Sequence, residues 1–110
     1  GRTTPSAVTD RTLALIVENM AASPFKAFTQ CNANDARAQA AASSARWEAG
    51  APLGPLDGVP IAVKETVDVE GYFNSQGTSF LARELGVCKG DCVSIARLKA
   101  AGAVIVGMTC

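Results

Sequence analysis

The spacing of apolar and polar positions changes along this chain and predicts an alternation of helices and strands. Over residues 7–22 the apolar side chains recur at helical intervals, and Thr9 or Asp10 is suited to cap the helix. Pro24 marks the end of this segment, because a proline disfavours helical geometry in the residue before it. One face of the helix is expected to pack in the core through four residues: Leu13, Ile16, Val17 and Met20.

A short strand and an alanine-rich helix are expected next. Residues 25–32 have the length and composition of a strand. The Asn34-Asp35 pair can cap a helix that runs to about residue 49, where Gly50 ends it. Trp47, near the end of this helix, is expected to pack against a neighbouring element.

The most informative segment is a nearly continuous apolar run at residues 59–63, which follows a glycine- and proline-rich approach at 54–58. Such a run is typical of a strand buried on both faces of a largely parallel sheet. Lys64 follows it directly. Two interpretations stay open: Lys64 is the solvated polar end of a strand, or it is a buried, neutral amine that can accept a proton from a hydroxyl nucleophile.

The pattern after the lysine is less regular. Residues 67–69 read as a second short extended stretch, and Gly71 begins a loop. Residues 72–80 combine polar side chains with aromatic ones, of which one or two are expected to be exposed. This loop either lines a pocket near the lysine or is an ordinary surface turn.

A helix and a second buried strand complete the pattern. Asp91 can cap the helix, Ile95 and Leu98 face inward, and Gly102 ends it. Residues 103–107 are a β-branched apolar run, which predicts a central parallel strand reached by a right-handed crossover. An apolar strand at the edge of a small sheet, without further cover, would favour aggregation. We therefore expect these residues to be one piece of a larger fold.

Composition and charge remove several classes of function. Ten basic and ten acidic side chains give no net charge, so neither nucleic acid nor an anionic membrane is expected as a partner. No apolar run approaches the roughly 18–20 residues that span a bilayer, and residues 1–5 do not resemble a signal peptide, although processing of the start stays open. The chain has four irregularly spaced cysteines and no histidine, which disfavours a disulfide scaffold and a zinc site and predicts reduced thiols in an intracellular protein.

Two segments carry a family resemblance. Residues 54–71, GPLDGVPIAVKETVDVEG, resemble the segment that holds the catalytic lysine in the amidase signature family of serine hydrolases. Residues 90–109 resemble the helix and strand that follow that lysine in the family, and residues 76–79 fall where the family has a turn of small residues. The resemblance covers roughly residues 10–110, in the expected order.

The resemblance implies a Ser–Ser–Lys triad in which one serine has a cis peptide bond, and Lys64 matches the lysine. In that chemistry the lysine takes a proton through the bridging serine, the other serine attacks an amide carbonyl, and water hydrolyses the acyl-enzyme. Both serines and the oxyanion loop belong to a downstream Gly/Ser-rich stretch that residues 1–110 do not contain. Ser75, Ser79 and Ser94 do not match them. Without these groups, the 110 residues are expected to be inactive alone.

Three positions depart from the family pattern. Glu65 stands where the family often has aspartate, Met108 where it commonly has lysine or arginine, and Cys110 where it has asparagine. The loss of the asparagine side chain at Cys110 is expected to affect local packing more than chemistry, and glutamate at position 65 is a modest change.

The resulting hypothesis is an α/β fold: part of the three-layer amidase-signature fold, with helices around a mixed or mostly parallel sheet and truncated at the C-terminus. Residues 1–110 would be the N-terminal part of a single amidase domain, helical over 7–50, with the lysine strand and the following α/β unit at 54–110. The expected function is amide hydrolysis with Lys64 as general base, acting on a small-molecule amide without cofactor or metal. The alternatives are a non-catalytic binding module and a subunit of a multi-chain amidotransferase. The expected partner is the rest of an amidase chain or a second chain. A homodimer is left open, and the expected location is cytoplasmic.

Overall fold

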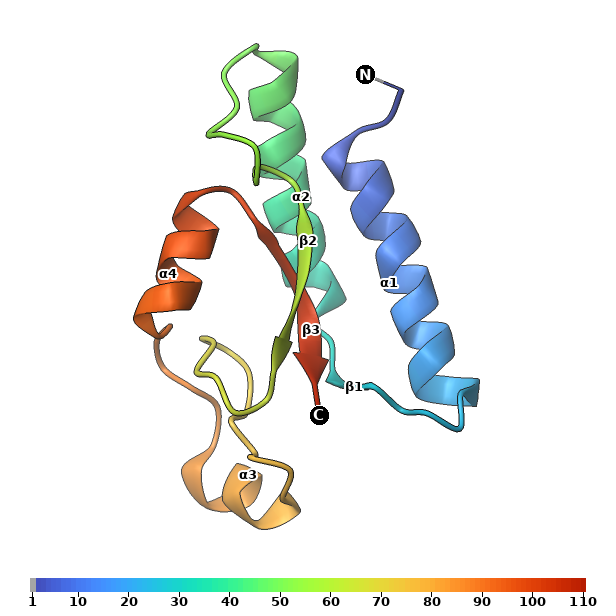
Figure 1. Cartoon of the computed structure of the whole chain (residues 1–110), viewed down its shortest axis with the longest axis vertical. Helices are drawn as coiled ribbons and strands as arrows, with labels where there is room; N and C mark the ends of the chain where they lie inside the picture. Colours follow the sequence, from blue (N-terminus) through green and yellow to red (C-terminus); the bar gives the residue numbers. More distant parts are fainter. Residues whose placement is uncertain (1) are drawn as a thin grey trace.

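The computed structural model describes residues 2–110 and places a small mixed sheet between helices (Figure 1). In chain order its elements are α1 (Pro5–Ala22), β1 (Phe28–Gln30), α2 (Ala33–Glu48), β2 (Pro60–Lys64), α3 (Ser79–Leu85), α4 (Val93–Ala100) and β3 (Val104–Thr109). Helices α1 and α2 lie on one side of the sheet and α4 on the other, so the expected α/β architecture is confirmed. Among the described residues, no helix is long and apolar enough to cross a membrane.

The sheet has the strand order β1-β3-β2. Strand β2 runs parallel to β3, and β1 pairs with the end of β3 in the antiparallel sense. Within residues 2–110, β3 is therefore the central strand, as its apolar run predicts. Strand β2 lies at an edge. Of its five residues only Val63 is buried, so the expectation of burial on both faces is wrong for β2 within the described chain.

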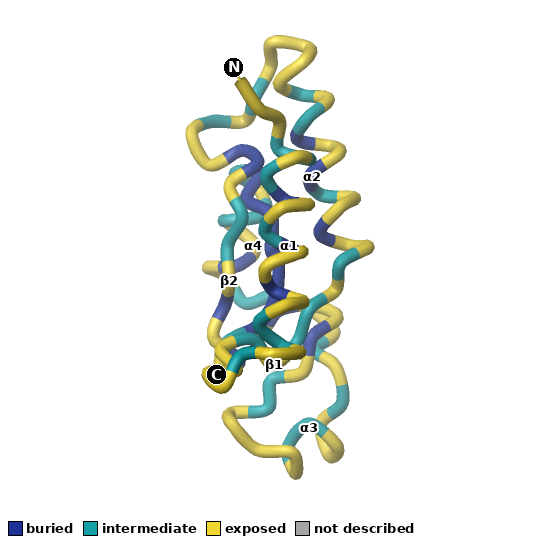
Figure 2. The backbone as a smooth tube through the Cα atoms, turned by 90° about the vertical axis from the view of Figure 1, so that its right-hand side faces the viewer, coloured by how far each residue is buried: buried dark blue, intermediate teal, exposed yellow. Residues whose placement is uncertain are grey.

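Strand β3 contributes to both cores. Val104 and Val106 pack with α1 and α2, whereas Ile105 and Met108 pack with α4 and β2. Alternation of side chains separates Val104 and Val106 from Ile105, and the register shift between Ile105 and Gly107 returns Met108 to the face of Ile105. The first core also contains Leu13 and Ile16 from α1 and Ala36 and Ala40 from α2. In Figure 2 the buried residues, in dark blue, lie along α2 and in the middle of the molecule, while the region around α3 is largely exposed.

Helix α1 begins earlier than the sequence indicates. Thr4, rather than Thr9 or Asp10, is its N-cap and accepts a hydrogen bond from the backbone N–H of Ala7. Thr9 is instead buried on the face that packs inward. The prediction that Val17 is in the core is wrong: it is 58% exposed, because one residue after Ile16 the helix has turned by about 100°.

Helix α2 confirms the alanine-rich segment but not its cap. The Asn32 side chain, rather than Asn34 or Asp35, caps the helix by accepting from the backbone N–H of Asp35. Its small buried residues let α2 approach α1 and β3 closely. The helix ends at Glu48, and Gly50 follows with a positive φ of 69°.

The segment between β2 and α4 differs most from the sequence prediction. Residues 67–69 are not a strand, although Val69 is buried in the second core. The predicted loop at 72–80 runs into the short helix α3, which Thr78 caps and which buries none of its residues. Asp91 does not cap α4. Its carboxylate accepts from the backbone N–H of Glu70 and from the Lys99 amine.

Candidate active site

Lys64 lies at the end of β2, beside the end of β3. The two strands run in the same direction and finish next to each other (Figure 1), and Lys64 is in register with Thr109. Just beyond the strand, the Glu65 backbone N–H donates to the Thr109 carbonyl at 2.8 Å. The carboxyl ends of parallel strands are the usual position of ligand sites in α/β sheets, which makes this edge the first place to look for chemistry.

The Lys64 side chain is exposed in the described chain. Its neighbour Val63 packs into the core beneath α4, so Lys64 projects from the opposite face of the sheet. No carboxylate of residues 2–110 lies within ion-pair distance of its amine. Of the two interpretations, the solvent-facing one describes Lys64 in this chain, and the amine is open to a further group from that side.

Glu65, directly after the lysine, is buried, with 5% of its surface exposed. Its Oε2 accepts two hydroxyl hydrogen bonds, from Ser75 Oγ at 2.6 Å and from Thr29 Oγ1 at 3.1 Å. From the sequence alone, Glu65 is only a modest departure from the aspartate that the family often has. Nothing in the local spacing indicates its burial, because Thr29 is 36 residues away.

The loop after β2 is held against β1. The Gln30 side-chain amide donates to the Phe73 carbonyl and accepts from the Phe73 N–H, both at 2.8 Å, which imitates the paired hydrogen bonds of a sheet. The Tyr72 hydroxyl accepts from the Asn32 N–H at 3.2 Å. These contacts form one wall of a surface groove of about 620 Å³ lined by β1 and residues 71–73. The loop therefore lines a groove, but Lys64 is not among the lining residues.

At the other end of β2, Asp57 is held by charge. Arg46 donates to its carboxylate through two nitrogens, Nε to Oδ2 at 2.8 Å and a terminal nitrogen to Oδ1 at 2.6 Å. The Leu53 N–H adds a third bond at 2.9 Å. The hydrogen bonds from Arg46, followed by that from Leu53, hold the pKa of Asp57 well below its ordinary value, although burial opposes them. We call this group, Arg46, Leu53 and Asp57, the Asp57 clamp.

Two further residues fix the clamp in place. Trp47 Nε1 donates to the Asp57 carbonyl at 3.0 Å, which confirms that this half-exposed ring contacts a neighbouring element. Gly102 has a φ of +88°, and its carbonyl accepts from the Gly58 N–H at 2.9 Å. A Cβ at Gly102 would overlap the Asp57 carboxylate, so only glycine fits there.

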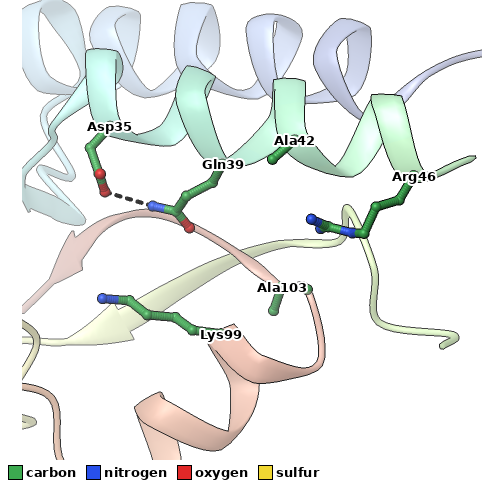
Figure 3. A pocket seen from close by; sticks show the side chains of 7 residues that line it. Asp35, Gln39, Ala42, Arg46, Lys99 and Ala103 are labelled. Atoms are coloured by element: carbon green, nitrogen blue, oxygen red, sulfur yellow. Dashed lines mark hydrogen bonds between the residues drawn. The ribbon is translucent and has the colours of Figure 1, made fainter. Parts of the chain in front are cut away.

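A second groove, of about 340 Å³, lies between α2 and the start of β3 (Figure 3). Its cations are already paired, Arg46 with Asp57 and Lys99 with Asp91. Gln39 spans the groove: its Oε1 accepts from the Ile105 N–H at 2.9 Å and its amide donates to Asp35 at 2.6 Å. Gln39 thereby satisfies a backbone group on β3 that no strand pairs, which explains the polar side chains here without a ligand.

The remaining candidate residues do not join Lys64. Ser75 bonds Glu65, Ser79 begins α3, and Ser94 contacts the Cys92 thiol at 3.2 Å. Of the positions that depart from the family pattern, Met108 is fully buried in the second core, whereas Cys110 is exposed. All four cysteines are free thiols, and residues 2–110 contain no group of three or more metal-binding side chains.

Comparison with known proteins identifies the family of this chain. A sequence model of the Amidase family matches residues 12–110. The chain is 34% identical over 109 residues to a fatty acid amide hydrolase of Medicago truncatula, covering 98% of this chain and 18% of that protein. It is 38% identical over 108 residues to a glutamyl-tRNA(Gln) amidotransferase subunit of a Roseiflexus species, covering 97% of this chain and 21% of that protein.

A solved structure shows the same fold. The peptide amidase in complex with the competitive inhibitor chymostatin superposes with a TM-score of 0.88 at 27% identity, over 99% of this chain and 22% of its own. The chain thus spans about a fifth of the length of these relatives. Because the family match and the superposition both extend over nearly all of its residues, this chain belongs to the amidase signature family.

Proposed function

We propose that the protein carrying this chain hydrolyses amide bonds and that Lys64 is its general base. The observation that carries the proposal is the position of Lys64: an exposed amine at the carboxyl end of β2, within the segment that resembles the family's lysine motif. Family membership supports amide chemistry, since a fatty acid amide hydrolase and a peptide amidase are among the relatives.

In this proposal Lys64 accepts a proton from a serine hydroxyl and later returns it to the leaving amine. The family resemblance supplies the rest of the mechanism: a Ser–Ser–Lys triad with one serine after a cis peptide bond, and an acyl-enzyme intermediate. No serine of residues 2–110 bonds the Lys64 amine, which agrees with serines contributed from outside this segment. We therefore expect residues 1–110, as one part of a single amidase domain, to be inactive alone.

The test is Lys64→Ala in the complete protein, with amide hydrolysis measured on a chromogenic amide. We expect kcat to fall by about 10²–10⁴-fold, since general-base catalysis contributes an effect of this size. The melting temperature should stay within experimental error, because the Lys64 side chain is exposed and unpaired within the described chain.

Two controls test whether the loss of activity is due to the loss of a proton acceptor at position 64 rather than to the loss of a positive charge. Lys64→Arg keeps the positive charge but cannot be deprotonated in this pH range, and should be as inactive as Lys64→Ala. Lys89→Ala removes another exposed lysine and should leave kcat unchanged. Near-normal turnover in Lys64→Ala would reject Lys64 as the general base, whereas absence of turnover in the wild-type protein would favour a non-catalytic module.

A second candidate is one component of a multi-chain amidotransferase, which the 38% identity to an amidotransferase subunit favours. In that case the purified complete protein should hydrolyse glutamine only when its partner chains are present. Hydrolysis of simple amides by the single chain would favour the stand-alone hydrolase. A cytoplasmic location and a homodimer stay predictions.

A further inference from the structure

We propose that Glu65 is a positioning residue for Lys64. By accepting hydrogen bonds from Thr29 and Ser75, it ties the end of β2 to β1 and to the following loop, and so fixes the backbone from which the lysine projects. The inference rests on the proposed function, because it assigns a role within the same site.

The environment of Glu65 is unusual for a carboxylate. Glutamate is rarely this deeply buried without a cationic partner, and within residues 2–110 no cation lies within ion-pair distance of it. Its burial is compensated by hydroxyl donors alone. An apolar side chain would fill the same space without desolvating a charge, so packing alone does not explain an acid at this position.

The contacts of Glu65 join three separate segments. Ser75 belongs to the loop that Gln30 holds through Phe73, and Thr29 belongs to β1, where its hydroxyl also lies 3.4 Å from the Met108 carbonyl. The Glu65 N–H bonds the end of β3. A displacement of any of these segments therefore moves the backbone directly after Lys64.

Lys64 is held on both sides in sequence while its own side chain is exposed. Val63 is buried in the second core and Glu65 is buried among the hydroxyls. Because a buried residue lies on each side of the exposed Lys64, the direction in which its side chain can point is restricted. Such restriction is what a general base requires, because proton transfer depends on the position of its nitrogen to within a few tenths of an ångström, roughly 0.5 Å.

The length of the side chain matters as well. Aspartate, the residue that the family often has here, is shorter by one methylene, about 1.5 Å. Because Ser75 and Thr29 approach the same oxygen from the loop and from β1, a carboxylate drawn back by that amount loses at least one of them. Glu65, Thr29 and Ser75 thus form a matched set in this chain.

The experiment compares Glu65→Ala, Glu65→Gln and Glu65→Asp in the complete protein. The readouts are kcat for amide hydrolysis, divided by the folded fraction from circular dichroism, and KM. We expect Glu65→Ala to lower kcat about 10- to 100-fold with KM within about threefold, since a positioning residue acts on proton transfer rather than on substrate binding. Glutamine can still accept both hydroxyl bonds and should restore kcat to within about threefold of wild type.

Partial losses and controls complete the design. Glu65→Asp should fall between alanine and glutamine. Thr29→Val and Ser75→Ala, which each remove one donor, should lower kcat by less than Glu65→Ala does. Glu70→Gln, at an exposed acid five residues on, is the matched control and should leave kcat unchanged.

The outcomes distinguish the inference from the proposed function. If Lys64→Ala is inactive and Glu65→Ala keeps wild-type kcat per folded molecule, the positioning role is rejected and the function stands. If Glu65→Gln is as impaired as Glu65→Ala, hydrogen-bonded positioning is likewise rejected. If Glu65→Ala does not fold, Ser75→Ala and Thr29→Val decide: unchanged kcat in both rejects the role. Activity in Lys64→Ala overturns the role of Lys64 as general base, and with it the positioning role of Glu65; amide hydrolysis itself is overturned only if the wild-type protein has none.

Discussion

The two ends of β2 each bury a carboxylate, and they hold it in opposite ways. Asp57, before the strand, is 4% exposed and paired with a guanidinium in two-point geometry. Glu65, after the strand, is 5% exposed and bonded to two hydroxyls. A two-point pair between oppositely charged groups is the stronger of the two kinds of contact. The start of β2 is therefore organised for stability, whereas its end carries the exposed lysine and the groups that orient it.

The largest effect that separates the two ends is expected from Asp57→Ala. The change leaves the Arg46 guanidinium without its partner and removes the acceptor for the Leu53 N–H. Deleting one member of a buried pair costs about 3–5 kcal/mol, which should appear as a large fall in the melting temperature. The value of kcat per folded molecule should stay near wild type.

Asp10→Ala is the matched control, because Asp10 pairs with Arg37 on the surface, with more than half of each side chain exposed. It should change the melting temperature little. A melting temperature that Asp57→Ala leaves unaltered would contradict the stabilising role of the clamp.

An acid titration of stability should show a smaller effect of the same clamp. The pKa of Asp57 is lowered in the folded state, so its contribution is fully present above the unfolded value of about 3.9 and is lost as the pH falls through the folded value. The stability difference between wild type and Asp57→Asn should therefore shrink as the pH falls below about 4. Urea unfolding between pH 6 and pH 2.5 measures this difference. A constant gap over that range would show that Asp57 does not titrate as described.

The smallest effect is expected from Trp47→Phe, which keeps an aromatic ring but removes the donor to the Asp57 carbonyl. The loss of one hydrogen bond at this half-exposed position should lower the free energy of unfolding by about 1 kcal/mol. Denaturant unfolding can measure it, and kcat should not change. A loss of activity without a loss of stability would place Trp47 in the site and weaken the contrast between the two ends.

Local pattern predicted the main elements because each has a strong signal of its own. The helical spacing around Leu13 and Ile16 and the β-branched run that became β3 both correspond to elements of the structure. Helix α3 escaped prediction because its seven residues are too few for the spacing of apolar side chains to distinguish a helix from a loop. Val17 was misplaced because apolar character alone does not determine which face of a helix is covered.

Of the candidate site, the sequence predicted only Lys64, through the motif that contains it. The surroundings of that lysine depend on contacts between distant residues: Thr29 with Glu65, and Gln30 with Phe73, which is 43 positions later. Asp91 likewise accepts a hydrogen bond from the backbone N–H of Glu70, 21 positions before it. Such pairs appear in a single sequence as ordinary polar residues at helix and strand ends, because no local periodicity relates their partners.

The double role of β3 has a consequence for how the chain folds. Since consecutive residues of β3 serve opposite cores, neither core can consolidate before this strand has inserted between α1, α2 and α4. Helices α1 and α2 form from local contacts, but bringing Val104 into the core that contains Ile16 closes a loop of nearly 90 residues, which is entropically costly and slow. Docking of β3 is thus the expected rate-limiting step for this part of the protein, and conservative truncations at Val104 or Ile105 should slow refolding more than they accelerate unfolding.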